Sequence, residues 1–248
     1  MVIKSTNVTV YFERIDNIKA AIVNNEKFFS SCFCPPTVLP VPDQLPDDAP
    51  RVIMQSVGGH SQLQFSKFFA SLVTFYDGEY ENDFQKCISN LTEKFNCISN
   101  FLLNEKVELL YMGFITTVLM NKTGTDVINM LNDKMNKITT NIPLYDYSNK
   151  LTFVVENDYF ANISFSNVRL FSSNNQYPQQ SPLTPGLALD DAEQDVEVII
   201  DINDRHAHNI NKDYRSEQSK FDFITNLSSK ALNDVCNFFN TGVLGENE

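Results

Sequence analysis

The fold class follows from the stretch Phe84-Gln-Lys-Cys-Ile88-Ser-Asn-Leu91-Thr-Glu-Lys-Phe95-Asn-Cys-Ile98-Ser-Asn-Phe-Leu102. The apolar residues Phe84, Ile88, Leu91, Phe95, Ile98 and Leu102 are separated alternately by four and by three positions. This spacing places them on one face of an α-helix, as a stripe over about five turns. We therefore expect a long amphipathic helix whose apolar face covers another layer of the fold.

Strand-like runs lie on both sides of this helix and are mostly consecutive. Before it, two runs around Gly58-Gly59 are typical of a hairpin. The other expected strands are residues 8–12, 68–76, 106–120, 151–155, 161–171 and 196–200, and the other long helix is residues 216–239. Shorter helices are expected at residues 15–22 and 125–138. This order predicts an α+β fold: one or more curved antiparallel sheets, with two long amphipathic helices packed on one face.

The length of 248 residues fits one α+β domain over residues 1–248. Two sub-units, residues 1–140 and 141–248, would each contain strands followed by a long helix. A diverged duplication is therefore an open alternative, although no sequence repeat is visible.

Three segments interrupt these elements. Residues 27–34 look extended, and residues 35–50 contain six of the ten prolines, which predicts an extended surface connection or an arm that grips a partner. Residues 172–195 are polar and predict a mobile surface loop. The acidic end of that loop provides four candidate partner-binding residues, namely Asp190, Asp191, Glu193 and Asp195.

The net charge indicates which class of partner to expect, and the cysteines indicate the compartment. The net charge of −12 repels nucleic-acid phosphate and anionic membranes, so we expect a protein partner with a basic surface and no direct nucleic-acid or membrane binding. Five cysteines without a regular framework, and the absence of a recognisable secretion signal, predict reduced thiols in the cytoplasm.

One polar cluster follows the expected strand 196–200. If the chain stays extended there, both imidazoles point to the same side and could share one ion. Two histidines with carboxylates suit zinc or another divalent metal, although these residue types are also ordinary in turns. The candidate metal ligands are Asp201, Asp204, His206 and His208.

Other catalytic signatures are absent from the sequence. There is no Gly-x-Ser-x-Gly elbow, no His-Glu-x-x-His motif and no dinucleotide fingerprint. The Gly58-Gly59-His60-Ser61 turn could place backbone N–H groups around an anion, but a hairpin turn explains it as well.

Two segments, taken together, resemble a sporadically distributed bacterial family of unknown function. One is Val41-Pro-Asp-Gln-Leu-Pro46-Asp-Asp-Ala-Pro-Arg51, and the other is Val198-Ile-Ile-Asp201-Ile-Asn203, followed by Phe221-Asp-Phe-Ile-Thr225 in the last expected helix. The family's Asp-Ile-Asp is Asp201-Ile-Asn203 here, which weakens the case for paired carboxylates. The resemblance implies an accessory gene, such as one for antiviral defence or toxin neutralisation, and implies no reaction.

These observations favour a non-enzymatic cytoplasmic interaction protein without a cofactor. It would bind another protein in bacterial defence, in toxin neutralisation or in phage inhibition of host defence. A metal-dependent hydrolase built on the four candidate ligands is one alternative, and an acidic nucleic-acid mimic is another. A small-molecule sensor with a cavity between sheet and helix also stays open.

Overall fold

The computed structural model describes residues 1–42, 45–121, 126–142, 144–170 and 193–245. The strands are β1 (Val2–Phe12), β2 (Thr37–Val38), β3 (Val52–Gln55), β4 (Ser61–Phe65), β5 (Phe69–Phe75), β6 (Leu109–Leu119), β7 (Ser148–Val155), β8 (Tyr159–Leu170) and β9 (Glu193–Asn203). The helices are α1 (Ile18–Asn24), α2 (Phe84–Glu105), α3 (Val127–Met135), α4 (Arg205–Ile210) and α5 (Ser219–Thr241), with a 3₁₀ turn η1 at Glu26–Phe28.

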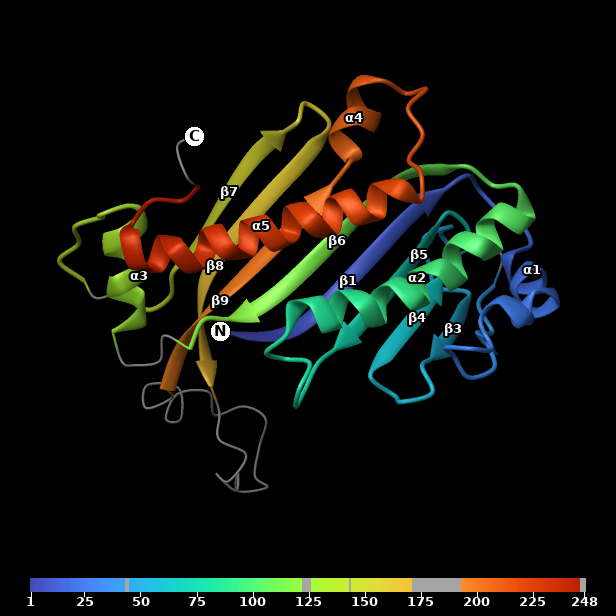
Figure 1. Cartoon of the computed structure of the whole chain (residues 1–248), viewed down its shortest axis with the longest axis horizontal. Coiled ribbons are helices and arrows are strands. Elements are labelled where there is room, and N and C mark those ends of the chain that lie inside the picture. Colours follow the sequence, from blue (N-terminus) through green and yellow to red (C-terminus); the bar gives the residue numbers. More distant parts are fainter. Residues whose placement is uncertain (43–44, 122–125, 143, 171–192, 246–248) are drawn as a thin grey trace.

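All nine strands of the described ranges belong to one antiparallel sheet with the order β2-β3-β4-β5-β1-β6-β9-β8-β7. The α+β class with an antiparallel sheet is thus confirmed. β1 and β6 lie next to one another in the middle of the sheet; β5, β4, β3 and β2 follow outward from β1, and β9, β8 and β7 follow outward from β6 (Figure 1). The sheet therefore runs without a break through both halves of the chain.

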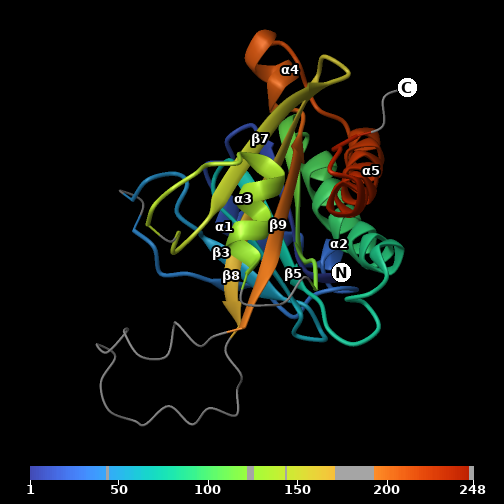
Figure 2. The same ribbon diagram turned by 90° about the vertical axis from the view of Figure 1, so that its left-hand side faces the viewer.

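The helices α2 and α5 lie on the same side of the sheet (Figures 1 and 2). α2 contacts β5, and α5 contacts β6 and β9. Phe95 of α2 stacks on Phe221 of α5 with ring centroids 4.1 Å apart, so the two helices share one core. The N–H of Lys86 donates to the Asp83 side chain and caps the start of α2.

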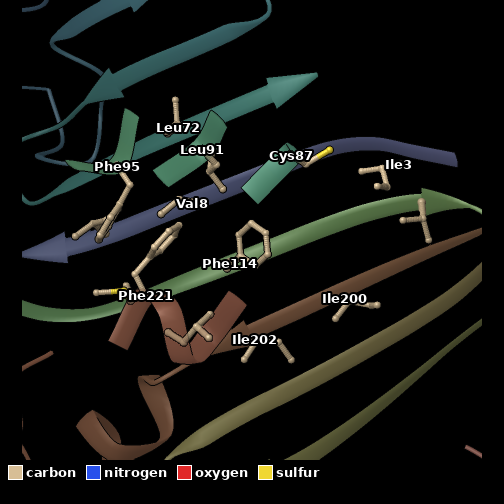
Figure 3. Packing of buried hydrophobic residues seen from close by; sticks show 14 of the residues in the cluster. Ile3, Val8, Leu72, Cys87, Leu91, Phe95, Phe114, Ile200, Ile202 and Phe221 are labelled. Atoms are coloured by element: carbon tan, nitrogen blue, oxygen red, sulfur yellow. The ribbon is translucent and has the colours of Figure 1, made fainter. Parts of the chain in front are cut away.

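The core forms because the central strands alternate. In β1 the residues Thr6, Val8, Val10 and Phe12 are buried, while the residues between them are partly exposed. Side chains at every second position of a strand point to the same face, so this pattern places them under the helices. Figure 3 shows Val8, Leu91, Phe95, Phe114 and Phe221 gathered between the sheet and the two helices.

Several local predictions were wrong. Residues 27–34 are not extended, because η1 and the following turn fold back and bury Phe29 and Phe33. The stretch after β9 is the helix α4 instead of an extended chain. Residues 193–195 belong to β9 instead of a loop, and the rest of that expected loop, residues 172–192, lies outside the described residues.

No helix in the described ranges is both long enough and apolar enough to cross a membrane.

Candidate functional site

The four predicted metal ligands are not brought together. Asp201 lies on β9 and accepts hydrogen bonds from the amides of Asn162 and Asn203, at 3.0 and 2.9 Å. His206 and His208 lie on α4, where successive residues are about 100° apart, so their imidazoles point to different sides. Across the described ranges there is no group of three His, Cys, Asp or Glu side chains that could hold a metal ion.

Each histidine has its own surroundings. The Nδ1 atom of His206 lies 3.0 Å from the carbonyl of Asn157, and its ring packs edge-on against Phe160. The ring of His208 lies 5.1 Å from that of Tyr111. These contacts hold α4 against the β7–β8 turn and against β6.

Asp204 is a buried carboxylate that joins three segments. It accepts hydrogen bonds from the N–H of Met112 at 2.7 Å, the hydroxyl of Tyr214 at 2.9 Å and the hydroxyl of Ser216 at 2.5 Å. Burial raises the pKa of Asp204 above its ordinary value, and these hydrogen bonds oppose that rise. The arrangement fixes the connection between α4 and α5 to β6, which is a structural role.

The four acidic residues predicted to bind a partner lie in different surroundings. Asp190 and Asp191 lie outside the described residues. Glu193 is exposed at the start of β9. Asp195 is only 1% exposed, and its carboxylate accepts hydrogen bonds from the N–H groups of Asn121 and Val196. Its placement on the surface was therefore wrong, because it satisfies backbone donors inside the fold.

A groove with a mainly apolar lining lies between β7 and α5. Its volume is about 500 Å³. Its floor comes from β8 and β9, and one wall comes from α5. It is lined by Phe153, Val154, Val155, Glu156, Ala161, Ile163, Ile202, Leu227, Lys230, Ala231, Asp234, Leu244 and Gly245.

The strand β7 adjoins this groove and ends the sheet. β8 is its only strand neighbour, so the backbone groups on its outer edge pair with no other strand among the described residues. Phe153 is 43% exposed and Val154 is 50% exposed on this strand. An eight-residue unpaired edge with exposed apolar side chains is a template for pairing with another chain.

Sequence reasoning missed this surface. The run Phe153-Val154-Val155 breaks the alternation expected of a half-buried strand, and that was the available signal. The identity of the edge strand depends on the strand order, which the sequence alone did not specify.

No protein-family model and no curated protein matches this chain.

Proposed function

We propose that this protein is an interaction module that binds an extended apolar segment of a partner protein. The segment adds as a strand to the outer edge of β7 and places an aromatic or large aliphatic side chain in the adjacent groove. The observation that carries this proposal is the unpaired edge of β7, with exposed Phe153 and Val154, beside a groove of about 500 Å³.

An internal comparison supports it. Outward from the centre, the order β1-β5-β4-β3 in one half corresponds to β6-β9-β8-β7 in the other. Val8 of β1 and Phe114 of β6 are paired in the sheet. When the sequences of the two strands are aligned with Val8 opposite Phe114, most of their buried positions coincide. We propose that the halves arose by a duplication that has since diverged.

The long helices fit the same correspondence. The buried positions of α2 and α5 can be matched with the same spacings of four, four, three, three and one. The matched pairs are Cys87 and Ile224, Leu91 and Ser228, Phe95 and Leu232, Ile98 and Val235, Phe101 and Phe238, and Leu102 and Phe239.

In the N-terminal half, the chain itself fills the position that corresponds to the groove. Phe29 packs between Phe65 of β4 and Phe101 of α2, and its ring centroid lies 5.7 and 5.5 Å from theirs. β2 also pairs antiparallel with the outer edge of β3. The chain thus supplies its own strand and its own aromatic side chain at this position.

In the C-terminal half the corresponding positions face the groove. Ile163 takes the place of Phe65, and Asp234 takes the place of Cys97, whose sulfur lies 3.9 Å from the Ser31 hydroxyl. The segment after β6 folds instead as α3, which contacts β8 and β9. No described strand covers β7. A partner segment would supply both missing parts.

Charge favours a different protein over a second copy as the partner. Two copies that each carry a charge of −12 repel one another, whereas a basic protein is attracted. We propose a partner segment flanked by lysine or arginine. A cytoplasmic role in bacterial defence, toxin neutralisation or phage inhibition would fit such a module.

The test uses the full chain and a displayed library of random twelve-residue peptides. We expect selected peptides to be extended and apolar, with an aromatic residue and basic flanks. The double variant Phe153→Lys/Val154→Lys should weaken their binding more than tenfold, because lysine on an edge strand opposes pairing. Leu103→Lys is the matched control, since Leu103 is 75% exposed on α2, away from this edge.

Two outcomes contradict the proposal. Peptides that bind the double variant and the control equally well would place the binding surface elsewhere. A homodimer of the wild type that dissociates in the double variant would show that a second copy occupies β7, and sedimentation velocity distinguishes this case.

A further inference from the structure

Lys94 is a buried cation on α2 without a carboxylate partner. The residue is only 8% exposed, and its ammonium donates a hydrogen bond to the side-chain oxygen of Asn90. Among the described residues, no carboxylate oxygen lies within 4.0 Å of it. Burying an ammonium group without a counter-charge is unfavourable, so this position calls for an explanation.

Two other cations are buried to a similar extent among the described residues, and each has more partners than Lys94, although the Nε of Arg51 has none. Lys67 is equally buried, and its ammonium lies 3.0 Å from the carboxylate of Asp47. The guanidinium of Arg51 donates to the carbonyls of Pro42, Leu45 and Pro46. Lys94 thus differs from both, because it has neither a carboxylate partner, as Lys67 has, nor a set of carbonyl acceptors, as Arg51 has.

Lys94 lines an open pocket of about 290 Å³ between α2 and the neighbouring ends of β3, β4 and β5. This volume suits a molecule of a few heavy atoms. Hydroxyl groups and apolar side chains make up much of the wall, and the exposed carboxylates of Asp77 and Glu93 also line it. The lining residues are Ser31, Cys32, Ser56, Val57, Gly58, His60, Thr74, Phe75, Tyr76, Asp77, Tyr80, Asn90, Glu93 and Lys94.

The charges in this pocket select a class of ligand. A neutral molecule would leave Lys94 without a counter-charge, and a phosphate would be repelled by the negative charges of Asp77 and Glu93. A small zwitterion satisfies both requirements, because its carboxylate can pair with Lys94 while its ammonium faces the acidic side chains.

We propose that this pocket binds a free amino acid or a zwitterion of similar size. The carboxylate of the ligand pairs with the ammonium of Lys94, and its ammonium group lies towards Asp77 and Glu93. This site belongs to the N-terminal half and is independent of the proposed partner surface at β7.

The test measures binding of each of the twenty amino acids to the full-length protein by calorimetry. For the tightest one, the corresponding acid without the amine and the corresponding amine without the acid are measured too. We expect the amino acid to bind more than tenfold tighter than either analogue. Lys94→Met should weaken binding more than tenfold, whereas Lys86→Met, a substitution at an exposed position of the same helix, should leave it unchanged.

The analogue comparison uses only the wild type, so it decides the matter even if Lys94→Met does not fold. The proposal is overturned if no amino acid binds, if inorganic phosphate or the simple acid binds as tightly as the amino acid, or if the two lysine variants bind equally well.

Discussion

Replacing Phe29 by alanine tests whether the segment around η1 fills the gap between the sheet and α2. Phe29 is 1% exposed, and its ring touches those of Phe65 and Phe101. A buried Phe→Ala change costs about 3–5 kcal/mol, because burial is lost and a cavity remains. Each aromatic contact contributes about 0.5–1.5 kcal/mol within that loss. We expect the free energy of unfolding to fall by about 3–5 kcal/mol.

Urea unfolding followed by circular dichroism measures this change. For a chain of this size, the melting temperature should fall by about 6–20 °C. Leu103→Ala is the control, since Leu103 is 75% exposed and should change stability by less than about 0.5 kcal/mol. A loss below about 1 kcal/mol for Phe29→Ala would refute the idea that this residue fills a gap. It would also remove the support that the N-terminal half gives to the proposed occupation of the groove.

Three further predictions concern other parts of the fold. Burial raises the pKa of Asp204, so the stability that this group contributes is fully present below its unfolded pKa of about 3.9 and is lost as the pH rises through the folded pKa. In urea unfolding, the stability difference between wild type and Asp204→Asn should therefore shrink from about pH 3.5 to pH 7. A difference that does not change with pH would contradict this. Ala231→Phe should fill the groove, leave stability unchanged or raise it by about 1 kcal/mol, and abolish peptide binding, whereas Asn233→Phe on the exposed face of α5 should keep it. Lys94→Met should keep or raise the melting temperature without ligand, because it removes an unpaired buried charge, and a fall of several degrees would show that the charge is satisfied.

Local patterns predicted most of the regular structure. The four-and-three spacing between Phe84 and Leu102 falls within the helix α2, because residues three and four positions apart lie on the same face of a helix. The hairpin around Gly58-Gly59 was predicted from the two glycines, because tight turns often need a residue with positive φ. In the structure φ is positive at Gly59. These signals depend on a few neighbouring residues, so tertiary contacts do not override them.

The errors arise where distant contacts decide the conformation. The histidine segment is helical because the turn at Asp204 is fixed by Met112, Tyr214 and Ser216, which lie far from it or beyond it in the chain. Asp195 is buried because Asn121 and Val196 offer backbone donors to its carboxylate. No periodicity in the sequence reports such pairings.

The candidate surfaces were even less predictable. The groove lies beside β7 because β7 ends the sheet and the segment after β6 forms the helix α3 instead of a further strand, and the strand order decides which strand is at the edge. The unusual state of Lys94 emerges only when the positions of all carboxylates are known. The expectation of a protein partner came from charge and from missing motifs, and it stays a prediction until binding is measured.

Amide hydrogen exchange of the protein with and without a bound selected peptide tests the central proposal most directly. The proposal predicts that the amides of β7, between Ser148 and Val155, become protected on binding, together with those of α5 that border the groove. Protection confined to the opposite edge at β2, or none in β7, would contradict it.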